Sequence, residues 1–178
     1  MTRVSFSRLA PSLHFALESR KHQLAGYQIY ATAEDGVNTL DGAYRALTAW
    51  TTSFDASENI QTIIRRPHEP VATLGKVLGD RSTLYKYLNQ HLVAVLTSNK
   101  VARQCSVYLV DGAKGTVLYH ATFPAANGAC NTHATLTENW LVYHYYDEAL
   151  QNPDGAMGYR LVSVELYEGT GTDNKTGR

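Results

Sequence analysis

The residues of this chain that could do chemistry are its two cysteines, its seven histidines and a few acidic and hydroxyl side chains near them. Gly79-Asp-Arg-Ser82 precedes His91, and aspartate, serine and histidine are the three groups of a hydrolase triad. We interpret the string as a tight turn that leads into a strand, in which Asp80 and Ser82 bond local backbone amides. Because geometry defines a triad, the spacing alone predicts no catalytic residue.

A second candidate is the pair Cys130 and His133, which has the spacing of a metal-binding pair. Cys105, His120 and His144 are further candidate ligands, but a structural zinc site usually draws on two close pairs. The sequence has one such pair, so we predict no metal site. It also contains no Gly-x-Ser-x-Gly elbow, phosphate-binding loop, dinucleotide-binding motif or His-Glu-x-x-His helix. We therefore predict no enzymatic activity and no cofactor.

Composition narrows the class of protein. The chain has 178 residues with 16 basic and 16 acidic side chains, and this balance argues against nucleic-acid binding, which needs a basic face. No apolar run approaches the roughly 18 to 20 residues of a membrane span. Residues 1–8 lack the apolar core of a signal peptide. The 12 tyrosines, with plentiful valine and threonine, favour a mostly β fold.

Runs of strand length recur along the chain, and one of them is apolar throughout. Within residues 91–98, Leu92, Ala94 and Leu96 face one way while Val93 and Val95 face the other, which is typical of a strand buried on both faces. The segment 83–88 is either a strand or a helical turn. The other expected strands are residues 13–17, 24–30, 46–54, 60–64, 105–111, 116–123, 139–146 and 159–167.

The order of these strands repeats. The runs that begin at His91 and Asn139 are 48 residues apart (139 − 91), and residues 13–54 show the same order. A period in the forties with four short strands is typical of a β-propeller blade, whereas the alternative is a β-sandwich. We predict an all-β fold that is part of a β-propeller of the quinoprotein or WD-repeat kind, with about three partial, antiparallel four-stranded blades. The whole of 1–178 is one segment, with blades at 1–70, 71–130 and 131–170 and a polar tail at 171–178.

Two further segments could contact partners. If 139–146 is a strand, one face carries Trp140, Val142, His144 and Tyr146, and the other carries Leu141, Tyr143 and Tyr145. We predict that both faces are mostly core between blades. Arg65-Arg66-Pro-His-Glu-Pro70 is expected to be an exposed loop whose arginines could meet an acidic partner.

Several strings together resemble a known family. They are Gly75 to Asn89, which contains Gly-Asp-Arg-Ser-x-Leu-Tyr-Lys-Tyr-Leu-Asn, then Val107 to Gly115, Thr137 to Tyr146 and Val164 to Thr170. Residues 74–170 are similar to the C-terminal luminal region of the largest subunit of the endoplasmic reticulum (ER) membrane protein complex. The resemblance implies a large luminal protein of β-propellers with one C-terminal transmembrane helix. It also implies membership of a multi-subunit insertase that places transmembrane segments into the ER membrane.

On this basis we expect a non-catalytic luminal scaffold segment, itself without a membrane span, whose partners are the other subunits of the complex. The alternatives are a quinoprotein-like propeller enzyme, suggested by the turn Asp111-Gly-Ala-Lys-Gly115, or a free-standing secreted binding module. A luminal position implies glycosylation at Asn174, the asparagine of the sequon Asn174-Lys-Thr176. It would also permit a bridge between Cys105 and Cys130. Because a propeller blade would place its outer strand between them, we predict two free, largely buried thiols instead.

Overall fold

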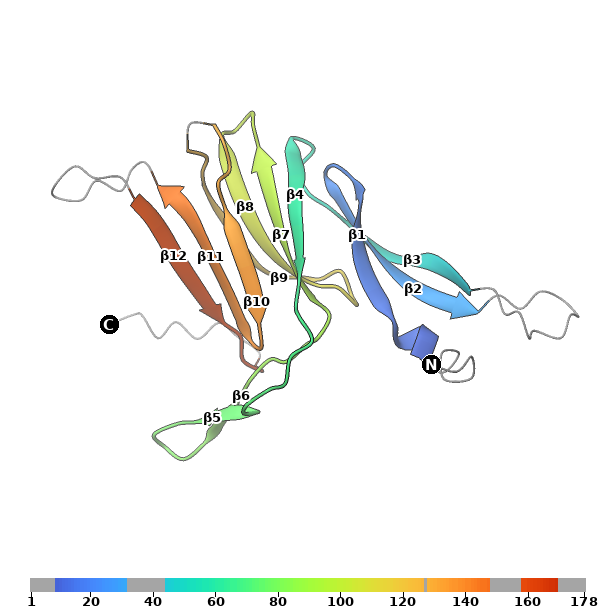
Figure 1. Ribbon diagram of the computed structural model, residues 1–178, viewed down its shortest axis with the longest axis vertical. Coiled ribbons are helices and arrows are strands. Elements are labelled where there is room, and N and C mark those ends of the chain that lie inside the picture. The colour runs from blue at the N-terminus through green and yellow to red at the C-terminus, as the bar shows by residue number, and fades with distance from the viewer. Residues whose placement is uncertain (1–8, 32–43, 127, 148–157, 170–178) are drawn as a thin grey trace, which may run out of the picture.

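The computed structural model describes residues 9–31, 44–126, 128–147 and 158–169 (Figure 1). After a short 3-10 helix, η1 (Ala10–Ser12), the first sheet has the antiparallel order β1 (His14–Arg20), β2 (Gln23–Ala31) and β3 (Tyr44–Ser53). The fold is all-β, as the tyrosine, valine and threonine content predicts.

The second sheet has four antiparallel strands in the order β4 (Glu58–Arg65), β7 (Leu92–Asn99), β8 (Gln104–Asp111) and β9 (Val117–Pro124). The third consists of β10 (His133–Thr137), β11 (Trp140–Asp147) and β12 (Gly158–Glu165). A separate hairpin is formed by β5 (Gly75–Val77) and β6 (Thr83–Tyr85). Since β4 pairs with β7, the first sheet ends at Ser53 and residues 58–65 belong to the second.

The three sheets lie face to face, with the second between the other two (Figure 1). Leu92, Ala94 and Leu96 of β7 pack toward the third sheet, in a core that includes Leu141 and Tyr143. Val93 and Val95 pack toward the first sheet, against Ala16, Leu24 and Phe54. Residues 92–98 are all buried, so the prediction of a strand covered on both faces is confirmed. A strand that is apolar on both faces needs a neighbouring sheet on each side.

Trp50 on β3 fixes the first sheet against the second. Its ring lies over Gly26 on the neighbouring strand, where an added Cβ would come within 2.0 Å of it. Its Nε1 donates a hydrogen bond to the Gly112 carbonyl at 3.1 Å, in the turn between β8 and β9. Gly115 in the same turn has φ +76° and faces the ring, so a Cβ there would meet Trp50 at 2.6 Å. Two glycines therefore make the space that one tryptophan occupies.

The prediction of two free cysteines is wrong, because Cys105 and Cys130 form a disulfide with Cα atoms 5.7 Å apart. The outer strand β9 does not separate them. The chain leaves β9 beside the start of β8, where the Ala125 amide donates to the Arg103 carbonyl at 2.9 Å. It then reverses in a turn closed by the bridge between Ala126 and Ala129, which returns Cys130 to Cys105. The bond lies in the core between the second and third sheets.

Within the part of the chain that the structure describes, no helix is both long and apolar enough to cross a membrane.

Candidate interaction site

The candidate triad is a structural turn. Asp80 accepts hydrogen bonds from the Ser82 amide at 2.9 Å and the Ser82 hydroxyl at 2.6 Å, at the tip of the β5–β6 hairpin. These bonds, the hydroxyl first, lower the pKa of Asp80 below its usual value. His91 lies immediately before β7, with its ring centroid 5.2 Å from that of His14. The interpretation of Gly79-Asp-Arg-Ser82 as a turn is confirmed.

The candidate metal pair is divided between two structural roles. Cys130 is held in the disulfide, and His133 stacks on His144 with ring centroids 5.2 Å apart. His120 stacks on Tyr108 at 4.1 Å. Among the described residues, no three histidine, cysteine or acidic side chains are grouped so as to hold a metal ion.

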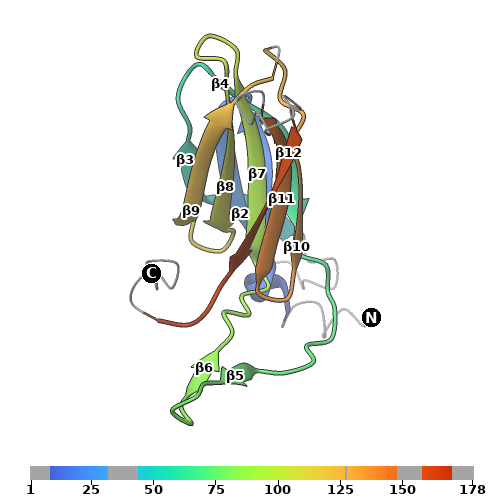
Figure 2. The ribbon, with the colours of Figure 1, turned by 90° about the vertical axis from the view of Figure 1, so that its left-hand side faces the viewer.

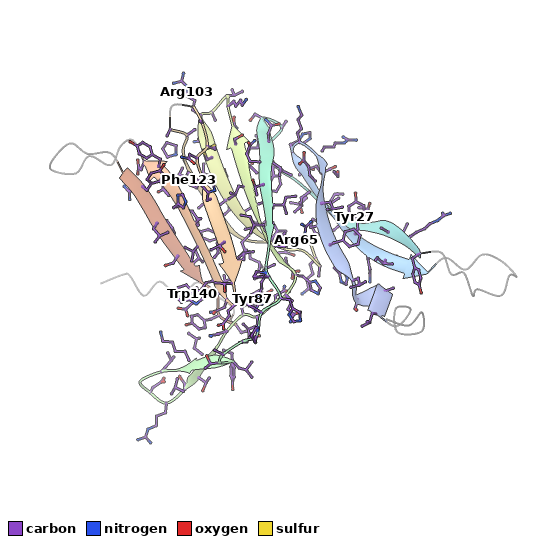
Figure 3. The ribbon with its side chains drawn as sticks, viewed as in Figure 1. Tyr27, Arg65, Tyr87, Arg103, Phe123 and Trp140 are labelled. Atoms are coloured by element: carbon purple, nitrogen blue, oxygen red, sulfur yellow. A yellow bond between two sulfur atoms is a disulfide. The ribbon has the colours of Figure 1, made fainter. Side chains whose placement is uncertain are left out.

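Strand β11 has one packed face and one open face. Leu141, Tyr143 and Tyr145 pack toward the second sheet, where the Phe123 ring lies 4.1 Å from Tyr145 (Figure 3). This half of the prediction for 139–146 is confirmed. The opposite face carries Trp140, Val142, His144 and Tyr146, all partly exposed, and no sheet of the described ranges lies beyond it.

Two open cavities lie between elements of the stack. One, of about 440 Å³, is lined by Asp111 at the end of β8, which is already bonded to the amides of Ala113 and Lys114. The other, of about 410 Å³, lies between β4, β7 and β10 and is lined by the hydroxyls of Thr97 and Thr132.

The most distinctive feature is the connection between β4 and β7. It runs from Arg66 to His91, which is 26 residues (91 − 66 + 1), although the two strands are antiparallel neighbours. Its middle part, residues 74–86, contains β5 and β6 and projects away from the sheets (Figures 1 and 2). We call residues 74–86 the arm.

Acidic side chains fix both ends of this connection to the third sheet. Glu69 accepts hydrogen bonds from the Thr137 hydroxyl at 2.5 Å and the Glu138 amide at 2.7 Å, in the turn between β10 and β11. Glu138 in turn accepts from the Ala72 amide at 3.1 Å and forms an ion pair with Lys86 at 2.6 Å. The segment expected to be a solvated loop at 65–70 is therefore anchored at Glu69.

Backbone pairing and a further arginine add to this anchoring. The Tyr87 amide donates to the Leu166 carbonyl at 3.1 Å, and the Glu168 amide donates to the Tyr85 carbonyl at 2.9 Å. On the other side, Arg65 reaches from β4 toward the first sheet and donates to the Ala16 carbonyl at 2.7 Å (Figure 3). Tyr87 and Trp140 lie at the same end of the stack, where the arm leaves it (Figure 3).

The anchoring carboxylates should show in a pH titration. Hydrogen bonds from Thr137 and Glu138 lower the pKa of Glu69, and those from Lys86 and Ala72 lower the pKa of Glu138, with the charge of Arg66 adding to both. A lowered pKa in the folded state means that this stabilisation is complete above the unfolded value, about 4.3. It is lost as the pH falls through the lowered values.

We expect the amide NMR signals of Ala72 and Glu138, which donate to these carboxylates, to titrate with midpoints below that of an exposed glutamate. In the Glu138→Gln variant the amide signal of Ala72 should no longer titrate, because its acceptor is no longer a carboxylate. The amide signal of residue 138 should still titrate with the carboxylate of Glu69. Midpoints at or above the ordinary glutamate value would show that the carboxylates do not hold the connection.

Three sheets stacked face to face through strands with two apolar faces make this chain part of a β-propeller. A family model described as "ER membrane protein complex subunit 1, second beta-propeller" matches residues 2–178. The chain therefore belongs to the family of ER membrane protein complex subunit 1, in the part described as its second β-propeller.

Relatives from distant organisms agree. The ER membrane protein complex subunit 1 of Schizosaccharomyces pombe is 34% identical over 116 residues, which cover 65% of this chain and 12% of that protein. That of Xenopus laevis is 32% identical over 133 residues, with 71% and 13% covered. That of Gallus gallus is 34% identical over 116 residues, with 63% and 11% covered. The chain thus spans about an eighth of the length of these relatives.

Proposed function

We propose that this chain is a non-catalytic scaffold segment on the luminal side of an ER membrane protein complex. The complex would insert transmembrane segments into the ER membrane, and this segment would act by contacts with other subunits, its parent protein being anchored by a C-terminal transmembrane helix. The observation that supports the proposal best is the family match across residues 2–178.

The absence of catalysis is part of this proposal. The groups that could react are used to build the fold: Asp80 closes a turn, Cys130 is in a disulfide, and Asp111 shapes the β8–β9 turn. Gly112 and Gly115 of that turn receive Trp50, which gives the quinoprotein-like sequence a packing role between sheets. We therefore expect the parent protein to act by binding other subunits and not by catalysing a reaction.

The assembly is testable in the full-length protein purified with a tag from membranes. Leu141→Asp places a charge in the core between the second and third sheets, where the leucine is fully buried. We expect this variant to lose the other subunits and the insertion of a reporter transmembrane segment. The control Leu118→Asp alters an exposed position on β9 and should retain both. An intact, active complex carrying Leu141→Asp would contradict a scaffold role.

The same preparation tests the luminal position. Asn174 lies outside the described residues, and we propose that it carries a glycan in the full-length protein. Glycosidase treatment should increase the gel mobility of the wild-type protein. The increase should be smaller in the Asn174→Gln variant, by the contribution of one glycan. An identical mobility shift in both proteins would place no glycan at Asn174.

A further inference from the structure

We propose that the arm, residues 74–86, is a docking element for an extended segment of another subunit of the complex. This inference rests on the proposed function, because it assigns the surface through which one subunit contact is made. The arm is singled out by its length, its anchoring, its exposed side chains and its open strand edge.

The length of the connection has no explanation within the stack. Two antiparallel neighbours such as β4 and β7 are commonly joined by about two to five residues. Here 26 residues are used (91 − 66 + 1), and they form a hairpin that leaves the sheets instead of filling a gap between them (Figure 2). Long connections in compact domains are usually either functional or linkers, and this one is held to the third sheet at both ends, unlike a linker. The arm carries no catalytic grouping, since Asp80 and Ser82 bond each other.

The anchoring makes the arm a fixed platform. Glu69 and Glu138 hold the chain before it, and the ion pair of Lys86 with Glu138 holds its end. The Glu168 amide bonds the Tyr85 carbonyl, which extends the hairpin into the segment after β12. A surface that is already ordered costs a partner less entropy on binding than one that must be ordered at contact.

The side chains of the arm are apolar and basic. Leu74, Val77 and Tyr85 are 69%, 72% and 58% exposed. Val77 and Tyr85 lie on one face of the hairpin, because Val77 pairs with Thr83 and Tyr85 with Gly75. Lys76 is exposed on the opposite face of the hairpin and Arg81 is exposed at its tip, whereas the one acidic side chain of the arm, Asp80, is bonded to Ser82. The Val77 and Tyr85 face fits apolar side chains, and the exposed cations at the tip and on the opposite face favour carboxylates elsewhere in the same segment.

The unpaired edge of β5 indicates that the bound segment is an extended strand. Among the described residues, β5 pairs with β6 alone, while the end of β6 is bonded on its other side to residues 167 and 168. The pairing of Lys76 with Leu84 directs the backbone groups of Gly75 and Val77 outward, since successive residues of an antiparallel strand alternate in direction. An added strand would satisfy these groups. The hydrocarbon of a membrane would not, so the geometry favours a protein segment over lipid.

The test places a photo-crosslinking amino acid at position 77 of the full-length protein in the assembled complex. The matched control is position 101, where the valine is 87% exposed in the turn between β7 and β8. We expect position 77, but not position 101, to give a crosslink to another subunit, at a peptide with alternating apolar residues and nearby acidic ones. Crosslinks from position 77 to the same polypeptide, to a second copy, to lipid or to nothing would each overturn the inference.

A variant without the crosslinking residue tests how much Val77 and Tyr85 contribute to binding of the other subunit. Val77→Asp with Tyr85→Asp should lower the recovery of that subunit about tenfold, as expected from the loss of two interface anchors. Val101→Asp should leave it unchanged. Because both arm side chains are exposed, the melting temperature of the variant should equal that of the wild type. Unchanged recovery would overturn the inference even if position 77 had crosslinked. If the protein co-purifies with subunits but position 77 crosslinks to none, the docking role of the arm fails and the proposed function stands; if it co-purifies with none, both fail.

Discussion

Removal of the bond between Cys105 and Cys130 should lower the free energy of unfolding by about 3.5 kcal/mol. The bond closes a loop of 25 residues, and a loop of this size restricts the unfolded chain by an entropy that corresponds to about 3.5 kcal/mol at 25 °C. The measurement is urea unfolding of the wild type beside the Cys130→Ser variant. Cys130 is the better position to change, because Cys105 is 2% exposed and its substitution would also disturb the core.

The control is the wild type under reducing conditions, which should unfold at the same urea concentration as the Cys130→Ser variant. Neither cysteine of the native protein should react with an alkylating agent until it is both reduced and unfolded. Rapid alkylation of both cysteines without reductant would show that the native protein holds free thiols, and the stability difference should then be absent.

The Gly115→Ala variant should lose about 3 kcal/mol of stability, through two effects that can be separated. The left-handed backbone at φ +76° costs a residue with a Cβ about 1 kcal/mol or slightly more. The new Cβ would also lie 2.6 Å from the Trp50 ring, so that the first and second sheets must move apart or the ring must turn. Overpacking of this kind costs typically about 1–3 kcal/mol.

Gly128 supplies the matched control. It has the same φ of +76°, and nothing lies within 4 Å of its added Cβ, so Gly128→Ala measures the backbone cost alone. Trp50→Ala should itself be destabilising by about 3 kcal/mol, at the low end for a tryptophan truncation because the ring is only partly buried. In the Trp50→Ala background the excess cost of Gly115→Ala over Gly128→Ala should disappear. An equal cost for the two glycine variants in the wild type would contradict the packing role of Gly115.

The strands with the strongest patterns could be predicted from the sequence. Residues 92–96 are apolar at every position, which is typical of a strand between two sheets, and β7 has that position in the structure. By contrast, β10 at His133–Thr137 has one large aliphatic residue, Leu136, and its strand character comes from pairing with β11. β5 depends in the same way on β6, because three residues carry too little periodicity to be recognised alone.

The disulfide and the anchoring of the arm could not be predicted, because both depend on the path of connections. Cys130 reaches Cys105 through a turn at Ala126–Ala129, and no periodic pattern encodes the direction in which that turn sends the chain. Glu69 and Glu138 are 69 residues apart in sequence and meet only because the third sheet lies beside the second. A carboxylate near a proline-rich loop gives no sign of a partner so distant along the chain.

The two buried faces of β7 also impose an order on synthesis. The first sheet precedes β7 in the chain and is available to cover Val93 and Val95 at once. The cover for Leu92, Ala94 and Leu96 includes Tyr143, which follows Leu96 by 47 residues (143 − 96). At about 5–20 residues per second, a ribosome takes roughly 2–9 s to make that stretch. During this interval an uncharged, strongly β-forming segment faces solvent, which is the composition of an aggregation-prone sequence. A chaperone that binds exposed apolar strands would therefore have this interval in which to bind the middle sheet of the nascent chain.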